Sequence, residues 1–334
     1  MIGGGDGTLD RWARRALTIP AAVLAFASAW ALSPLLLAAA LAVDLLRPRR
    51  LGALRGTAVL LLYLLFEVLG LAGILWLVAT GAARGDPERL HRFERWWARS
   101  LLGMLLRTFG MRLEVEGLEA VAPGPILVFG NHASIADPLL SATLVEGRCG
   151  IRLRYVAKRE LVWDPCIDLA GQYLPYVFVR RGASDTPGDV ARVQGLLAGL
   201  GPGDGILMLP EGARLTAGKR ERLLGGSEGP ERALLARRLA HLLPPRLGGM
   251  LGLFERNAEA DVVFMAHVGF DGVRGLADLR SGALVGRAVR VAFWRRPWAG
   301  MPRETAGRAA WIHREWGDLD AWVGRARAGV DHQG

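Results

Sequence analysis

The chain has 334 residues, of which 51% are hydrophobic and 22% are charged, a balance that excludes a disordered or fibrous protein. Its 42 Lys and Arg residues against 32 Asp and Glu residues give a net charge of +10, which favours anionic partners such as nucleic acid, acidic lipid or a phosphorylated substrate. The mean hydropathy of +0.23 is high for a water-soluble protein. Cys149 and Cys166 are the only cysteines, and no CxxC or CxxH spacing lies near them, so neither a disulfide framework nor a structural zinc site is indicated.

Two long apolar runs dominate the N-terminal part of the chain. Residues 16–43 contain no charged side chain, and residues 57–80 contain only Glu67. Each run exceeds the roughly 20 residues that a membrane-spanning helix needs. We therefore expect residues 1–86 to form a membrane anchor of two apolar helices. Pro34 is expected to kink the first of them, and a re-entrant hairpin at this proline is the alternative.

Arginines flank both apolar runs on every side, so the positive-inside rule discriminates weakly. The leader and the C-terminal part together carry more arginines than the connecting loop. This balance predicts a protein of the cell inner membrane with its C-terminal part in the cytoplasm. Glu67 is either a functional group or a carboxyl that is protonated or hydrogen-bonded to the other helix.

Residues 87–110 are predicted to form an amphipathic helix. Apolar residues recur at helical spacing, arginines occupy the remaining face, and Trp96 and Trp97 stand together. Such a helix suits the headgroup boundary of a membrane. An ordinary amphipathic helix that covers the following domain is the alternative.

From residue 111 the pattern becomes that of an α/β domain, predicted over 111–326, with 327–334 as a frayed tail. Helices are expected over 231–243 and 311–323, and an exposed loop over 216–230. Short apolar runs flanked by Gly and Pro predict buried strands over 125–129, 176–179, 205–209 and 260–264. The predicted fold class is thus α/β, with N-terminal membrane helices followed by a sheet flanked by helices.

The first predicted strand delivers Asn131 and His132, with Asp137 five residues after the histidine. On a regular helix this spacing would separate the two side chains by about 140°, so they can meet only if His132 lies on the turn before the helix. A carboxylate on one imidazole nitrogen would leave the other nitrogen free to accept a proton. A histidine that caps a turn beside an aspartate that begins a helix is the purely structural alternative.

Two further strand ends carry charged residues. Glu211, Gly212 and Arg214 follow the strand at 205–209, where the glycine permits a tight turn and the arginine could grip a phosphate with both arms of its fork. Arg180 and Arg181 follow the strand at 176–179. Each group, taken alone, could equally be a solvated surface cluster.

In this order and behind an apolar anchor, the three segments resemble the 1-acylglycerol-3-phosphate (PlsC-type) acyltransferase family. Its H-x4-D motif matches His132 and Asp137, its F-x-x-R block matches Phe178 and Arg181, and its P-E-G-x-R block matches Pro210, Glu211, Gly212 and Arg214. The run 241–249 is similar to the P-R-x-x-G block of one branch of the family. Ala213 departs from the usual threonine, which removes a hydroxyl and neither charged group.

The resemblance implies acyl transfer from acyl-CoA or acyl carrier protein to the hydroxyl of a lysophospholipid, with 1-acylglycerol-3-phosphate as the expected acceptor and phosphatidic acid as the product. It assigns His132 as general base and Asp137 as its support, with no metal and no cofactor beyond the acyl thioester. Another lysophospholipid or a lyso-aminolipid is the alternative acceptor. A non-catalytic lipid-binding membrane protein is the alternative to an enzyme. No nucleic-acid partner is expected, because the sequence contains no nucleic-acid-binding motif. The residues expected to bind substrate are Asn131, Lys158, Arg181, Glu211, Gly212 and Arg214.

Overall fold

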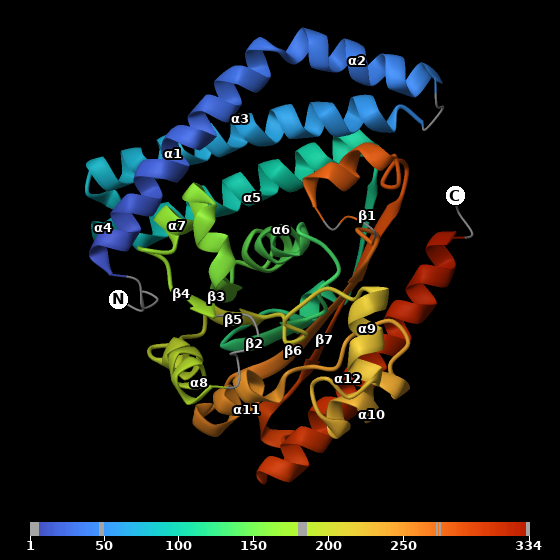
Figure 1. Cartoon of the computed structure of the whole chain (residues 1–334). Coiled ribbons are helices and arrows are strands. Elements are labelled where there is room, and N and C mark those ends of the chain that lie inside the picture. The colour runs from blue at the N-terminus through green and yellow to red at the C-terminus, as the bar shows by residue number, and fades with distance from the viewer. Residues whose placement is uncertain (1–6, 47–49, 180–185, 272, 274, 332–334) are drawn as a thin grey trace.

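The computed structural model describes residues 7–46, 50–179, 186–271, 273 and 275–331. Its centre is a seven-stranded sheet in the order β1-β7-β6-β2-β5-β3-β4 (Figure 1). The five strands from β6 to β4 run parallel, whereas β7 is antiparallel to β6 and parallel to β1. The strands are β1 (Arg112–Glu116), β2 (Ile126–Gly130), β3 (Arg152–Lys158), β4 (Tyr176–Val179), β5 (Asp204–Met208), β6 (Asp261–Val268) and β7 (Ala288–Arg296).

Helices cover both faces of the sheet, which confirms the predicted α/β class. Strand β2 is buried along its whole length because its alternate side chains enter two different cores. Ile126 and Val128 pack in one core with α5 (Pro87–Phe109), α6 (Asp137–Ser141) and α7 (Pro165–Ala170). Leu127 and Phe129 pack in the other core, which contains side chains of α8 (Pro187–Gln194), α11 (Leu247–Arg256) and α12 (Thr305–Asp331).

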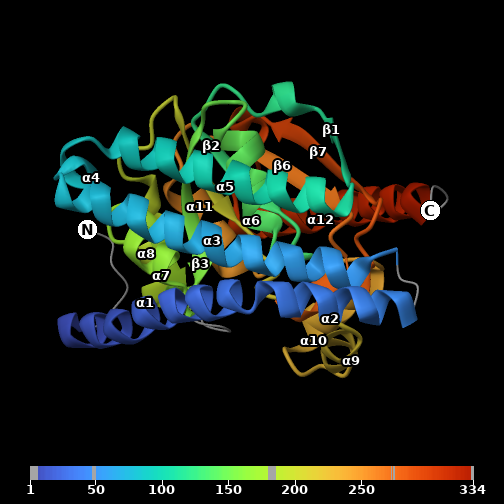
Figure 2. The ribbon, with the colours of Figure 1, turned by 90° about the horizontal axis from the view of Figure 1, so that it is seen from above.

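The N-terminal residues form a bent helix pair and one long straight helix. α1 (Thr8–Ala31) and α2 (Ser33–Leu46) meet at an angle of 66°, beside Pro34 as expected, and α3 (Gly52–Ala79) follows them. Among the described residues, α3 is long and apolar enough to cross a membrane, and the bent pair qualifies only if it counts as one span. Figure 2 shows α3 lying between the α1–α2 pair and α5.

α3 packs against the α/β domain near both of its ends. At Gly56 an added Cβ would lie 2.7 Å from the Cα of Arg280, in the 3-10 helix η5 (Leu276–Ser281). At Gly70 the nearest atoms belong to Trp97 of α5 and Cys166 of α7. Glu67 is buried on the same side of α3, where one of its carboxylate oxygens lies within 4.8 Å of an Asp164 oxygen and the Cys166 Sγ. The apolar helices therefore share a packed interface with the domain.

The polar start of α1 is fixed to α7 by a buried cluster of charges. Arg15 Nε donates to Asp168 Oδ2 at 2.5 Å, and a nitrogen of Arg14 donates to Asp168 Oδ1 at 2.7 Å. Arg15 also donates to the side-chain oxygen of Gln172 at 2.8 Å. The three charged side chains are at most 9% exposed. The arginines that precede the first apolar run thus belong to helix α1 and attach it to the domain.

Asp168→Ala should destabilise the protein strongly, because it leaves two buried guanidinium groups without their carboxylate. Removal of one partner from a buried ion pair costs about 3–5 kcal/mol. We expect a loss of this order in the free energy of unfolding measured in detergent. Asp318→Ala, at an exposed position of α12, is the matched control. Equal stability of the two variants would show that α1 is held without this cluster.

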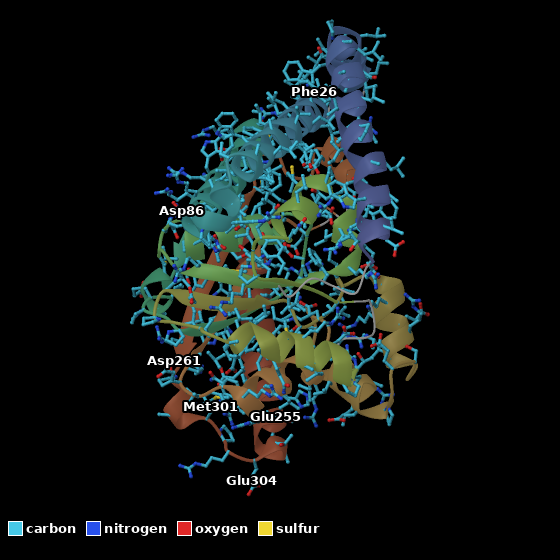
Figure 3. The ribbon with its side chains drawn as sticks, turned by 90° about the vertical axis from the view of Figure 1, so that its left-hand side faces the viewer. Phe26, Asp86, Glu255, Asp261, Met301 and Glu304 are labelled. Atoms are coloured by element: carbon cyan, nitrogen blue, oxygen red, sulfur yellow. The ribbon has the colours of Figure 1, made fainter. Side chains whose placement is uncertain are left out.

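Several predicted elements differ from the structure in extent. The expected loop over 216–230 is wrong, because it contains α9 (Ala217–Leu224); the Thr216 side chain caps this helix by accepting from Lys219 N, and Leu223 is buried. The helix expected over 231–243 ends earlier, as α10 (Pro230–Arg238). α12 continues through Asp331, so the start of the expected tail is helical. Figure 3 places Phe26 of α1 and Glu304, which precedes α12, at opposite ends of the molecule.

α5 has the predicted extent and packs on both sides. Leu90, Leu102 and Phe109 are buried against the domain, and the Trp97 indole donates to the carbonyl of Phe66 in α3 at 2.9 Å. Trp96 remains 47% exposed. α5 therefore covers one side of the domain, and its position at a membrane boundary stays a prediction.

Candidate active site

The site residues gather at the carboxyl edge of the parallel part of the sheet. His132 follows β2, Lys158 ends β3, Glu211 follows β5, and His267 lies near the end of β6. These strands are neighbours in the order β6-β2-β5-β3. Parallel strands bring their carboxyl ends to one edge, where open α/β sheets place their ligands. The four side chains therefore come from segments far apart in the chain.

The structure brings His132 and Asp137 together. His132 lies on the turn before α6, and Asp137 is the first residue of that helix. The distance between His132 Nδ1 and Asp137 Oδ2 is 2.8 Å. The backbone N–H groups of Ala133 and Ser134 donate to the same carboxylate at 2.8–3.0 Å. This fixed carboxylate can hold the imidazole with a proton on Nδ1, so that Nε2 is left as the basic nitrogen.

Lys158 lies at the other ring nitrogen of His132. Its Nζ is 3.2 Å from His132 Nε2. The His132 side chain is 13% exposed and the Asp137 side chain is fully buried, so the ring presents Nε2 and Lys158 together to incoming molecules. Arg181, the remaining cation expected here, lies outside the described residues.

Glu211 is turned towards the protein backbone. One of its carboxylate oxygens accepts from His132 N at 2.7 Å, and the other accepts from Leu243 N at 3.0 Å. Burial raises the pKa of this carboxyl to about 8. Gly212 has a φ of +66°, as the predicted tight turn requires, and the turn carries Arg214 into the wall of a cavity. The structure thus gives Glu211 a place in positioning His132 and leaves Arg214 facing the cavity.

The raised pKa of Glu211 links stability to pH. The folded protein keeps the proton up to about pH 8, whereas the unfolded chain releases it near 4.5. The carboxyl therefore contributes its full stability below about pH 4.5, and this contribution is lost as the pH rises to about 8. Glu211→Gln should flatten that decline in the free energy of unfolding, and Glu221→Gln, at an exposed position, should retain it. Parallel curves for Glu211→Gln and the wild type would contradict this assignment.

Asn131 and His267 are hydrogen-bonded to each other next to Asp137. Asn131 Oδ1 accepts from His267 N at 2.9 Å, and Asn131 Nδ2 donates to the His267 carbonyl at 3.0 Å. His267 Nε2 lies 3.0 Å from the Asn131 carbonyl and 3.7 Å from Asp137 Oδ1. Asn131, which was expected to bind substrate, therefore ties β2 to β6, and His267 is a neighbour of Asp137 that the sequence analysis did not identify. Its only signal was a histidine inside an apolar strand.

A second unpredicted contact fixes the opposite wall of the site. Asp320 of α12 accepts the backbone N–H groups of Ala240, His241 and Leu242 at 2.7–2.9 Å. The indole of Trp316 donates to the Leu243 carbonyl at 2.9 Å. Since Leu243 N in turn donates to Glu211, helix α12 is connected to His132 through a continuous series of hydrogen bonds.

His132 lines two cavities of different character. The larger, about 380 Å³, is mostly apolar and runs among side chains of α5, α6 and β3. Among its lining residues are the cations Lys158, Arg214 and Arg246. The smaller, about 280 Å³, is more polar and is lined by residues that include Glu211, His241 and Arg327. A reacting group at His132 therefore has access to an apolar space and to a polar space.

Comparisons with known proteins agree with this geometry. The family model named Acyltransferase matches residues 112–241. The chain is similar in structure to the crystal structure of the 1-acyl-sn-glycerophosphate (LPA) acyltransferase PlsC from Thermotoga maritima, with a TM-score of 0.50 and 14% sequence identity over 78% of this chain and 96% of that chain. The comparison with curated protein sequences found no match.

The matched segment of the family model contains His132, Asp137, Lys158, Glu211 and Arg214, and the fold is that of the PlsC structure. Residues 112–241 therefore match the family model of acyltransferases, which indicates that the protein is an acyltransferase.

Proposed function

We propose that the protein transfers a fatty acyl group from an acyl thioester to the free hydroxyl of 1-acylglycerol-3-phosphate, which yields phosphatidic acid. The observation that carries this proposal is the position of His132. Its Nδ1 is held by Asp137, its Nε2 lies 3.2 Å from Lys158 Nζ, and its side chain lines both an apolar cavity and a polar one.

In the proposed mechanism His132 acts as a general base. Nε2 takes the proton of the acceptor hydroxyl as the oxygen attacks the thioester carbonyl carbon. Asp137 stabilises the imidazolium that forms. Collapse of the tetrahedral intermediate breaks the carbon–sulfur bond, and the imidazolium returns the proton to the departing thiolate. The products are the ester and the free thiol, and no covalent enzyme intermediate is needed.

The cations at the apolar cavity support an anionic acceptor. Arg214 and Lys158 line it together with Arg246, whose backbone N–H donates to the Pro210 carbonyl at 2.8 Å. An arginine fork binds phosphate oxygens in pairs, and an ammonium adds a point charge. We assign the acceptor phosphate to this group and the donor's acyl chain to the apolar part of the same cavity.

An assay against several acceptors tests the proposal. Membranes that contain the protein are supplied with labelled acyl-CoA and, in turn, with 1-acylglycerol-3-phosphate, glycerol-3-phosphate, other lysophospholipids and a lyso-aminolipid. We expect labelled phosphatidic acid as the main product. His313→Ala, far along α12 from the site, serves as the histidine control for a His132→Ala preparation. Preferential acylation of another acceptor would refute the assigned substrate, and transfer to none would refute the proposed function.

The N-terminal helices are proposed to hold the protein in the cell inner membrane with the acyltransferase domain in the cytoplasm. Leu24, Leu35 and Trp76 are among their apolar side chains that remain at least 65% exposed. Both substrates of the proposed reaction carry acyl chains, so attachment brings the site to its acceptor. The protein should remain in the membrane pellet after washing with alkaline carbonate and with high salt. Recovery in the carbonate supernatant would contradict integral attachment.

A further inference from the structure

The polar cavity beside His132 is built from segments that meet only in the folded protein. Residues 131–133 and Glu211 form the wall shared with the active site. Residues 215–217, which lead into α9, form another wall. The remainder comes from His241, Leu242, Asp271 and Arg327, the last from α12. Most of this last wall lies beyond residues 112–241, the segment that the family model matches.

The charges in this cavity do not suit a phosphate. Arg327 donates to Asp271 Oδ1 at 2.5 Å, and another of its nitrogens lies 3.3 Å from His241 Nδ1. The positive charge is therefore balanced by a carboxylate at the same place, and the pKa of Asp271 is lowered by this arginine, although burial opposes the shift. The apolar cavity has three cations and two carboxylates, Glu94 and Glu160, among its lining residues, so it keeps one cation in excess. The polar cavity offers hydrogen-bond donors and acceptors without a net charge for a phosphate.

The reaction requires the acyl donor to extend in two directions from His132. A fatty acyl thioester has an apolar chain on one side of the reacting carbonyl and a polar thiol component on the other. If the acyl chain occupies the apolar cavity, the thiol component of the bound donor must extend from His132 in a different direction. In both CoA and acyl carrier protein that component is a pantetheine arm, an uncharged chain with two amides. The polar cavity, which shares His132 with the apolar one, has matching chemistry.

The wall that would contact this arm is fixed in advance of binding. Asp320 holds the backbone N–H of His241 and of the residues on either side of it, as described above. The His241 ring packs on α12 at Gly324, where an added Cβ would lie 2.7 Å from His241 Nε2. A preformed wall lowers the entropy lost when a flexible ligand binds. In Figure 1, α9 and most of α12 lie in the lower half of the molecule, and α1–α3 form its top.

We propose that the polar cavity binds the pantetheine arm of the acyl donor, with Arg327 donating a hydrogen bond to an amide carbonyl and the His241 ring holding Arg327 in place and forming the adjacent wall. This inference rests on the proposed acyl transfer. It adds a binding residue and a positioning residue outside the family motifs, and it predicts that CoA and acyl carrier protein use the same site.

The test compares donors that contain or lack the arm. Arg327→Met and His241→Phe are assayed with acyl-CoA, with acyl carrier protein thioesters and with the S-ethyl thioester of the same fatty acid. We expect the KM for the two natural donors to rise about tenfold in each variant, as loss of one charge-assisted or neutral hydrogen bond implies. The KM for the acceptor and the rate with the S-ethyl thioester should stay unchanged. Arg325→Met, at an exposed position of the same helix, is the matched control.

A binding measurement tests the proposed donor site independently of the proposed acceptor. Pantetheine alone should compete with acyl-CoA for the wild-type protein, and Arg327→Lys, which keeps the charge opposite Asp271, should weaken this competition less than Arg327→Met. A higher acceptor KM in the variants, an equal loss with the S-ethyl thioester, or absence of competition would each overturn the inference. A rise confined to acyl-CoA or to acyl carrier protein would contradict the prediction that both donors place their arm in this cavity. If pantetheine competes and no acceptor is acylated, the proposed function fails and the donor site stands.

Discussion

Replacement of His132 by alanine should abolish turnover. The imidazole is the group at this site that combines a basic nitrogen facing the cavities with a carboxylate on its other nitrogen. Loss of a general base lowers the rate by about 10²- to 10⁴-fold. We expect a fall in kcat of at least this size, with little change in the KM of either substrate, because the phosphate and the acyl chain are bound by other residues.

Asp137→Asn separates orientation from basicity in the same experiment. The amide cannot accept all the hydrogen bonds that the carboxylate takes from His132 Nδ1 and from the N–H groups of Ala133 and Ser134. His132 remains present, so residual activity above that of His132→Ala is expected. Circular dichroism and the melting temperature show whether each variant is folded. A folded His132→Ala protein with near wild-type activity would refute the mechanism.

Arg214→Lys should raise the KM for the lysophospholipid markedly and leave the KM for the acyl donor nearly unchanged. Lysine keeps the positive charge and loses the paired donors that fit phosphate oxygens. Loss of one charge-assisted contact corresponds to about 1.5–3 kcal/mol, or roughly ten- to more than a hundredfold in kcat/KM for the acceptor. Release of thiol from acyl-CoA to water, without acceptor, should be little affected because it requires His132.

Arg222→Lys is the matched control for this variant, since Arg222 lies on the exposed face of α9. It should leave both KM values unchanged. A defect of Arg214→Lys that is confined to the acyl donor, or an unchanged acceptor KM, would show that the turn after β5 has a different role, such as holding a structural ion pair.

The sequence predicted the elements whose local signals are strong. β4 and α5 have their predicted extents, because a four-residue apolar run bounded by Pro175 and a helical pattern bounded by Pro87 and Gly110 leave few alternatives. β1, β3 and β7 were not predicted, since charged side chains interrupt the apolar residues of all three strands. Arg154, for example, donates to the carbonyls of Leu196, Ala198 and Gly199. In β3 these charges leave an apolar run of only three residues, 155–157.

In the site, too, contacts between residues close in sequence could be predicted, whereas contacts between residues far apart in sequence could not. The spacing of His132 and Asp137 required a turn before the helix, and the structure contains that turn. The partners of Glu211, by contrast, are backbone groups at His132 and Leu243 that no side-chain motif encodes. Asp320 and His267 reach the site only because α12 and β6 are packed there, so their roles depend on the fold and could not be predicted from spacing.

The packing of α3 also bears on how the chain is assembled during its synthesis. Gly56 of α3 packs closely against the backbone of η5. Near the start of α1, Arg15 is bound by Asp168 of α7. Both partners are made after the apolar helices have left the ribosome, and η5 is made only when most of the sheet has been translated. Contacts between segments so distant in sequence form late. The contact between α3 and η5 can therefore form only after η5 has been synthesised, and a chain that stops before residue 276 would lack it.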